Sequence, residues 1–255
     1  MKSLEVQLRH LRDTGRKALV PYFVAGLTPD WVRHVEAAVH AGADAVEIGI
    51  PFSDPMMDGV VIQAAAMRAL EAGTTLDSIC ADLAALGSPV PMIAMTYFNI
   101  FHHYGLERSA GKLRASNIIG AIVPDLALEE AADWKQACDA SDVATVFLVA
   151  PSTTADRVAR IAHASEGFVY ASARMAVTGR ASDAGESGRV VASIRAVSDL
   201  PTYVGIGITT PQQAREAGEQ SDGVIVGSAL VKLILDGGDA SSVEAFVGGF
   251  RRALD

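Results

Sequence analysis

Two carboxylates in the first quarter of the chain are placed where they could exchange a proton with a bound molecule. Glu47 follows a short strand-like run, so we expect it at a strand's carboxyl end, and Asp58 lies on a proline-bracketed apolar loop, residues 51–59. Barrel enzymes hold their catalytic groups at that end of the strands. Apolar or aromatic side chains are expected around Glu47: Ile48, Ile50, Tyr97, Ile122 and Tyr170. Burial would raise the pKa of Glu47 while Asp58, nearer to solvent, stays ionised, so the pair predicts a general acid and base.

Each acid alone has a simpler interpretation, since Asp58-Gly59 is a common turn and a lone glutamate at a strand end is usually solvated. Other residue types that carry chemistry are less favourably arranged. His102 and His103 are adjacent and cannot share one face, so we expect no metal site. The sequence contains neither the GxSxG elbow of serine hydrolases nor the HExxH helix of zinc proteases.

Composition narrows the classes of function. The chain has 255 residues, half of them apolar, and a net charge of −9, which fits one barrel domain spanning residues 1–255. It has no dense basic cluster, which argues against nucleic-acid or anionic-membrane binding. No apolar run approaches the roughly 20 residues that span a bilayer, and no signal segment opens the chain, so we expect a soluble, cytoplasmic protein. The two cysteines, Cys80 and Cys138, are interpreted as core thiols.

Short apolar runs alternate with helical patterns about eight times along the chain. The expected strands are residues 19–24, 45–49, 92–96, 120–123, 145–149, 168–171, 202–205 and 223–226. The expected helices between them include residues 29–41, 76–86, 129–140, 154–164, 188–197 and 211–218.

This alternation predicts a (β/α)8 TIM barrel, with an extra N-terminal helix at residues 4–14 and a C-terminal helix at residues 243–254. A doubly wound open sheet is the competing architecture. That fold favours a glycine-rich turn after the first strand, whereas residues 25–29 read Ala-Gly-Leu-Thr-Pro.

The last strands are followed by segments that could bind phosphate through backbone N–H groups. Gly207 follows the seventh strand, and Gly227 with Ser228 follows the eighth. A Gly-Ser pair before a helix is also an ordinary helix cap. The long segment 173–188, rich in Gly, Ala and Ser, is a candidate lid that would bring Thr178 and Gly179 over the same group, or else a plain surface connection.

Several ordered segments together resemble the α subunit of tryptophan synthase, which cleaves indole-3-glycerol phosphate. The resemblance covers essentially the whole chain and is most specific at Pro-Phe-Ser-Asp-Pro (51–55) and Val-Thr-Gly (177–179). The further matching segments are residues 20–22, 47–63, 95–99, 123–126, 147–151, 167–170, 204–208 and 226–229.

The resemblance implies a role for each matching residue. Glu47 would protonate the indole ring and Asp58 would hold the indole N–H. The implied substrate-binding residues are Tyr22, Tyr97, Ile122, Tyr170 and Thr178, and the implied phosphate-binding residues are Gly179, Gly207, Gly227 and Ser228.

The resemblance also implies a partner, a β subunit that carries pyridoxal phosphate and receives the indole. Phe52, Asp54 and Met56 of the apolar loop would contact it, and no cofactor would be needed in this chain. Two alternatives stay open: a stand-alone lyase that releases free indole, and a catalytically poor partner that activates the β subunit.

The chain departs from the usual pattern of that family at several positions. Val60 stands where a proline is common, Ala127 follows Asp125-Leu126 in place of a proline, and Ile206 stands where phenylalanine is frequent. In the lid, Ala176 replaces a glycine, which would disfavour a backbone with positive φ. We therefore expect activity, with lid closure and coupling to the partner as the properties most affected.

Overall fold

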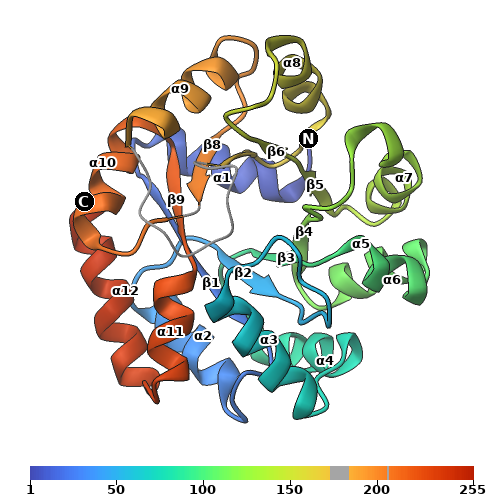
Figure 1. The fold of residues 1–255 in the computed structure, drawn as a ribbon, viewed down its shortest axis with the longest axis vertical. Helices are drawn as coiled ribbons and strands as arrows, with labels where there is room; N and C mark the ends of the chain where they lie inside the picture. The colour runs from blue at the N-terminus through green and yellow to red at the C-terminus, as the bar shows by residue number, and fades with distance from the viewer. Residues whose placement is uncertain (173–183, 206) are drawn as a thin grey trace.

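The computed structural model describes residues 1–172, 184–205 and 207–255. Within these residues, nine strands form one parallel sheet in the order β5-β4-β3-β2-β1-β9-β8-β7-β6 (Figure 1). The strands are β1 Ala18–Val24, β2 Val46–Gly49, β3 Met92–Met95, β4 Ile118–Ile122, β5 Ala144–Val146, β6 Leu148–Val149, β7 Val169–Ser172, β8 Thr202–Gly205 and β9 Gly223–Val226.

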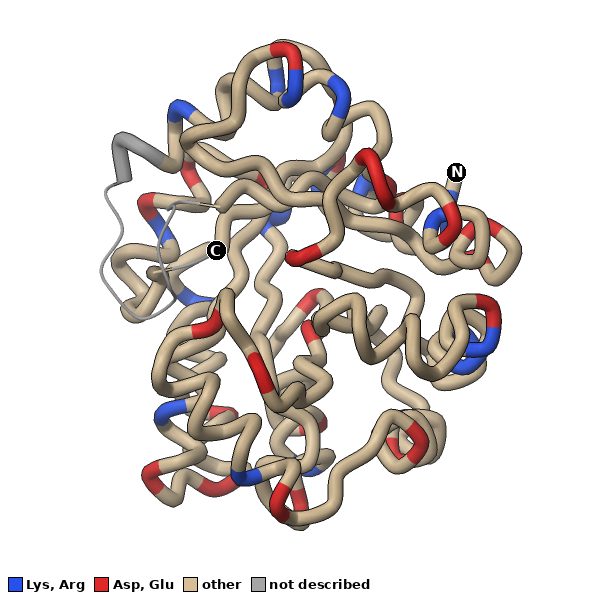
Figure 2. Tube along the Cα trace, turned by 45° about the vertical axis from the view of Figure 1, so that its right-hand side comes forward, with Lys and Arg blue, Asp and Glu red and all other residues tan. Residues whose placement is uncertain are grey.

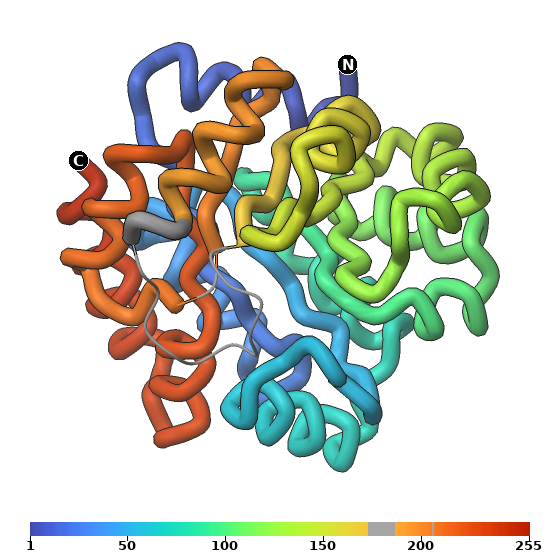
Figure 3. The backbone as a smooth tube through the Cα atoms, turned by 45° about the horizontal axis from the view of Figure 1, so that its top comes forward, coloured from blue at the N-terminus to red at the C-terminus, as the bar shows by residue number. Residues whose placement is uncertain are grey.

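Helices surround this sheet (Figure 3). They are α1 Ser3–Asp13, α2 Trp31–His40, α3 Val60–Glu71, α4 Leu76–Leu86, α5 Phe98–Tyr104, α6 Leu106–Ala115, α7 Ala132–Ala140, α8 Ala155–Ala164, α9 Ala184–Arg195, α10 Pro211–Gln220, α11 Ser228–Leu235 and α12 Ala240–Leu254, with a short 3-10 helix η1 at Leu128–Glu130.

The sheet closes on itself at Phe147. β5 and β6 stand at the two ends of the strand order, yet only Phe147 separates them in the chain. The Tyr170 N–H donates to the Phe147 carbonyl at 3.1 Å. This hydrogen bond joins β7 to the residue that separates β5 from β6. The (β/α)8 barrel is therefore confirmed and the open sheet is wrong. The expected strand 145–149 is corrected to two short strands, because the chain bends at Phe147 to change partners.

Apolar side chains form two layers of core. The larger layer lies between the strands and the outer helices, where Phe101 of α5 stacks on Trp134 of α7 with centroids 4.5 Å apart. The smaller layer fills the barrel interior and includes Val20, Ile93 and Phe168. Both cysteines are buried, as the sequence predicts. Acidic and basic residues are interspersed over the helices in the view of Figure 2.

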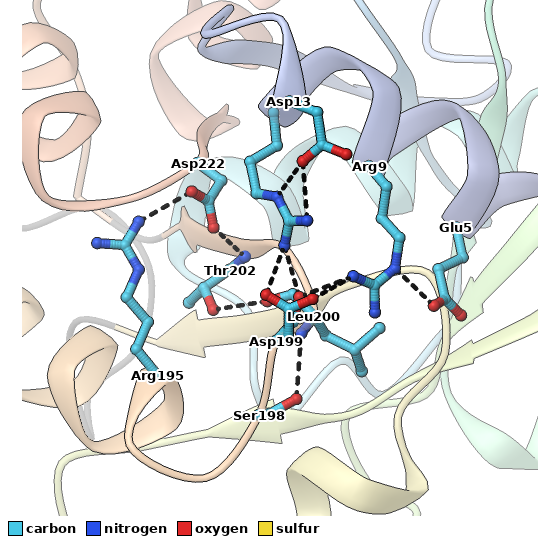
Figure 4. A network of polar contacts seen from close by, with 10 residues as sticks. Glu5, Arg9, Asp13, Arg195, Ser198, Asp199, Leu200, Thr202 and Asp222 are labelled. Atoms are coloured by element: carbon cyan, nitrogen blue, oxygen red, sulfur yellow. Dashed lines mark hydrogen bonds and ion pairs between the residues drawn. The ribbon is translucent and has the colours of Figure 1, made fainter.

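The N-terminal helix α1 covers the base of the barrel. Leu4 and Leu8 are fully buried, and Leu4 packs so closely on Gly120 and Gly167 that a Cβ at either glycine would come within 2.6 or 2.8 Å of its Cδ2. Figure 4 shows Arg9 of α1 between Glu5 and Asp199, the latter lying just before β8. The extra N-terminal helix is confirmed, and it leaves the opposite end of the barrel, where the strands' carboxyl ends meet, for chemistry.

The C-terminal helix α12 is joined to the barrel by a buried ion pair. Arg251 Nη1 lies 2.9 Å from Asp44 Oδ2, and both side chains are less than a tenth exposed. The same Asp44 oxygen accepts the Leu19 N–H of β1 at 2.9 Å. The helix begins at Ala240, earlier than expected, because the Asp239 side chain caps it by accepting the Ser242 N–H.

Among the described helices, none is both long and apolar enough to cross a membrane.

Candidate active site

Glu47 lies within β2, and parallel pairing places it beside Tyr22 of β1 and Ile93 of β3. It is 1% exposed, and its Oε2 atom has no hydrogen-bond partner among the described residues. The expectation that it stands at the strand's carboxyl end is wrong, because Ile48 and Gly49 continue β2 beyond it. The acid is therefore set deeper in the barrel than the sequence indicated.

The surroundings of Glu47 change its acidity. Burial, and secondly the charge of Asp58, raise its pKa from an ordinary 4.5 to about 8. The prediction that burial raises this pKa is confirmed. Because a group with that pKa is mostly protonated at neutral pH, Glu47 can donate a proton there and accept one afterwards.

Two tyrosines share this space with the acids. Burial raises the pKa of Tyr22, on β1, and of Tyr170, on β7, and the negative charges of Glu47 and Asp58 raise both further. Both phenols are therefore neutral hydrogen-bond donors at neutral pH. The sequence predicts Asp58 and Tyr170 near Glu47, and the structure adds Tyr22 to this group.

Two glycines make room for these tyrosines. A Cβ at Gly49 would come within 2.1 Å of the Tyr22 hydroxyl oxygen, and a Cβ at Gly205 within 1.9 Å of that of Tyr170. The sequence interpretation missed this role. The available signal was that β2 and β8 each end in a glycine, Gly49 and Gly205. The reason for a glycine at these positions is visible only from where the two tyrosines lie.

Asp58 lies in the turn ahead of α3 and is half-buried. Its Oδ2 accepts a hydrogen bond from the Tyr97 hydroxyl at 3.0 Å, and Gln63 donates to its backbone carbonyl at 2.8 Å. Burial raises the pKa of Asp58, and the Tyr97 hydrogen bond opposes that rise. The two acids thus differ mainly in their contacts: Asp58 is held by a phenol, whereas one oxygen of Glu47 is unpaired.

The loop at residues 51–59 has an inner and an outer side. Phe52, expected on the surface, is half-buried and stacks on Tyr97 with ring centroids 5.1 Å apart and planes inclined by 27°. Met56 and Met57 are 73% and 50% exposed, and Asp54 is exposed. The apolar outer surface expected of this loop is therefore carried by the methionines rather than by Phe52.

Beside Asp58 lies a small, partly open cavity of about 20 Å³. That is space for about one water molecule, so a larger ligand could enter it only if its walls move. Its walls include Tyr22, Phe52, Asp58, Ile62, Met95 and Tyr97.

Two of these wall residues were missed from sequence. Ile62 lies in the first turn of α3, four residues after Asp58, and its apolar type beside a predicted site residue was the available signal for it. Met95 ends β3 and pairs with Ile122, a predicted site residue that ends β4 and is fully buried.

The expected phosphate-binding residues follow β8 and β9, which are paired neighbours. Gly207 has a positive φ of +91°, a backbone conformation that favours glycine. Gly227 is the N-cap of α11 and, as a glycine, offers no side chain to cap it, and Ser228 begins the helix. The first N–H groups of a helix have no intrahelical acceptor. Thr178 and Gly179 lie outside the described residues.

A bound metal ion needs a group of ligand side chains that lie close together. Within the described ranges, no three His, Cys, Asp or Glu side chains come together as a metal site would require.

Comparison with known proteins assigns the family. A family model described as tryptophan synthase alpha chain matches residues 8–247. The chain belongs to the tryptophan synthase alpha chain family.

Individual members of the tryptophan synthase alpha chain family align over nearly the full length. The protein of that name from Thermobifida fusca is 43% identical over 262 aligned positions, covering 100% of this chain and 97% of the relative. The one from Solibacter usitatus is 41% identical over 249 positions, covering 96% and 93%.

Solved structures give the same fold. A Mycobacterium tuberculosis tryptophan synthase structure matches with a TM-score of 0.92 and 36% identity, covering 99% of this chain and 98% of that one. Tryptophan synthase subunit alpha from Legionella pneumophila matches with a TM-score of 0.91 and 31% identity, covering 100% and 99%.

The departures from the expected tryptophan synthase alpha pattern fall in different settings. Val60 is the first residue of α3 and is 78% exposed, a position where proline is favoured but not needed, because the first helical N–H has no intrahelical acceptor. Ala127 immediately precedes η1. Ala176 and Ile206 lie outside the described residues.

Proposed function

We propose that this chain cleaves indole-3-glycerol phosphate into indole and glyceraldehyde 3-phosphate, and that a tryptophan synthase β subunit receives the indole. Membership of the tryptophan synthase alpha chain family supports the reaction. The observation that carries the mechanism is Glu47, a buried carboxyl beside Asp58 whose pKa is about 8 and whose Oε2 has no partner among the described residues.

The reaction is a retro-aldol cleavage in which the indole ring takes up the electrons of the broken bond. Glu47 donates its proton to the ring carbon that bears the glycerol phosphate chain, which leaves a positive charge on the ring nitrogen. Glu47, now a carboxylate, then removes the proton from the hydroxyl next to that carbon. The hydroxyl becomes the aldehyde of glyceraldehyde 3-phosphate, the carbon–carbon bond breaks, its electrons return to the ring, and Glu47 ends protonated as it began.

Asp58 has the complementary role. Its carboxylate accepts the indole N–H and stabilises the positive charge that develops there, a task for which it must be ionised. The Tyr97 hydrogen bond favours that ionised form against the effect of burial. Tyr22, Tyr97, Ile122 and Tyr170 surround the ring in this proposal.

The phosphate group is assigned to the segments after β8 and β9. Gly207, Gly227 and Ser228 would contact it, and the N-terminus of α11 suits an anion because its first N–H groups lack intrahelical acceptors. Thr178 and Gly179 are assigned to the same group from sequence.

The β subunit is assigned to the outer side of the loop at residues 51–59, through Asp54 and Met56, whereas Phe52 faces inward onto Tyr97. Met56 and the adjacent Met57 are 73% and 50% exposed, so two neighbouring apolar side chains of this loop are open to a partner. Pyridoxal phosphate is assigned to that subunit, because the steps assigned to this chain are proton transfers that its own side chains can perform.

Indole release from indole-3-glycerol phosphate tests the proposal, with and without a β subunit. We expect slow release by the chain alone, faster release with the partner, and loss of both in Glu47→Gln and Asp58→Asn. Glu36→Gln, on the exposed side of α2, is the matched control and keeps full activity. No release under either condition, or full release by Glu47→Gln, would contradict the proposal.

A further inference from the structure

Tyr97 contacts the loop at residues 51–59 at three places. Its hydroxyl donates to Asp58 Oδ2 at 3.0 Å and accepts the Met57 N–H at 2.8 Å. Its ring stacks on Phe52 at 5.1 Å. Tyr97 is 4% exposed, so these contacts are shielded from water. One side chain thus holds the backbone, an aromatic ring and the carboxylate of the same loop.

The backbone around Tyr97 is fixed to the carboxyl-terminal ends of β2 and β4 and to the residues that follow them. Thr96 donates its N–H to the Ile122 carbonyl at 3.2 Å and its hydroxyl to the Ile50 carbonyl at 3.0 Å. On the other side, the Phe98 N–H donates to Asp125 Oδ1 at 2.9 Å. Because its backbone is held by hydrogen bonds to the barrel strands, Tyr97 can hold the loop at residues 51–59 in a more precise position than a residue of a freely moving loop could.

We propose that Tyr97, beyond lining the ring-binding site, is the positioning residue that fixes the place and the charge of Asp58. The inference rests on the proposed function for its catalytic consequence but not for its structural one. Because the Tyr97 hydroxyl occupies Oδ2, it leaves Oδ1 to face the N–H of a bound ring.

The electrostatic setting makes this hydrogen bond matter. Besides Tyr97, the titratable groups among the described residues that interact with the charge of Asp58 are Glu47 of β2, Tyr22 of β1 and Tyr170 of β7. None of these is a cation, so nothing positive among them compensates for burial of the carboxylate. The Tyr97 hydroxyl is the contact that opposes the rise in the pKa of Asp58. Without it, Asp58 would gain a proton at a higher pH and lose its ability to stabilise a positive charge.

Tyr97→Phe tests the proposal because it removes the hydroxyl and keeps the ring that stacks on Phe52. The first measurement is the pKa of Asp58, from carbon-13 NMR of protein labelled at the aspartate carboxyl carbons, with the Asp58 signal assigned by its loss in Asp58→Asn. We expect Tyr97→Phe to raise this pKa by roughly one pH unit, the scale of one hydrogen bond to a carboxylate.

The second measurement is the pH dependence of kcat/KM for cleavage of indole-3-glycerol phosphate, because this quantity reports the pKa values of the free enzyme, which is also the state that the NMR titration measures. We expect the acid limb to move upward by the same amount, roughly one pH unit, with KM changed less than about twofold. The control is Tyr104→Phe, which removes another tyrosine hydroxyl bonded to a carboxylate, that of Asp77, away from the site. Tyr104→Phe should change neither the pKa of Asp58 nor the position of the acid limb.

Two results would overturn the inference. One is an unchanged pKa of Asp58 in Tyr97→Phe. The other is an acid limb that stays in place while KM rises, which would mean that Tyr97 serves only as a wall of the ring-binding site. Failure of the proposed function gives a different pattern, because the unmutated chain would then show no cleavage while the NMR titration still reports on Tyr97 and Asp58.

Discussion

Glu47→Gln should inactivate the enzyme and stabilise its fold in a pH-dependent way. Glu47 is 1% exposed, and burial raises its pKa to about 8, so the folded protein keeps a proton there that the unfolded chain has already released. Glutamine has no proton to lose across this range. The general acid and base is removed as well, which should lower kcat by about 100-fold to 10,000-fold.

The magnitude follows from proton linkage. Between the ordinary pKa of 4.5 and about 8, the folded state binds one more proton than the unfolded state, so stability falls as pH rises. The slope is about 1.4 kcal/mol per pH unit, and the whole interval amounts to at most about 5 kcal/mol. Relative to the protein at high pH, the stability that the retained proton of Glu47 adds is fully present below pH 4.5 and is lost above about pH 8.

Urea unfolding of the unmutated chain and of Glu47→Gln, at several pH values between about 5 and 9, measures this difference. The free energy of unfolding of the variant, relative to the unmutated chain, should increase with pH and level off above about pH 8. The buried glutamine amide adds a constant cost that leaves the slope unchanged. Glu36→Gln should follow the unmutated chain at every pH. Parallel curves for Glu47→Gln and the unmutated chain would refute the reasoning.

Three further predictions concern packing around and beneath the site. Gly205→Ala should lower kcat at least tenfold and cost about 1–3 kcal/mol in urea unfolding, because its Cβ would come within 1.9 Å of the Tyr170 hydroxyl; unchanged kinetics would contradict this. Arg251→Met should cost about 3 kcal/mol, since it leaves the buried Asp44 with one cation fewer, and a loss below about 1 kcal/mol would show that the pair contributes little. Leu8→Ala should cost about 2–5 kcal/mol in the same assay, whereas Val6→Ala, on the exposed side of α1, should cost under about 0.5 kcal/mol.

The strand order could be predicted from sequence because a parallel barrel repeats one simple pattern. Each strand is a short apolar run followed by a helical period, and the predicted strands 202–205 and 223–226 coincide with β8 and β9. Glu47 and Asp58 were found because charged residues stand out within apolar segments. The burial of Glu47 followed from the same pattern, since its neighbours are apolar on both sides.

Contacts across the barrel could not be predicted in the same way. The interruption of the fifth strand at Phe147 depends on where the sheet must close, which no local run of residues reveals. The hydrogen bond from Tyr97 to Asp58 joins side chains that are distant in sequence, and the stacking of Phe52 turned an expected surface residue inward. Gly49 and Gly205 are explained only by the tyrosines beside them. These features depend on how side chains of different strands, helices and loops contact one another, whereas sequence periodicity reports only on the single strand or helix that carries it.

The position of α1 imposes an order on how the chain can assemble. Leu4 packs on Gly120 and Gly167, and Arg9 pairs with Asp199, so α1 docks on segments that are synthesised much later than α1 itself. Until then its apolar side, with Leu4 and Leu8, has no native surface to cover it. Contacts of such long sequence separation also slow folding, because a large loop must close before they form. The base of the barrel is therefore completed late, although the helix that covers it is synthesised before every strand it covers.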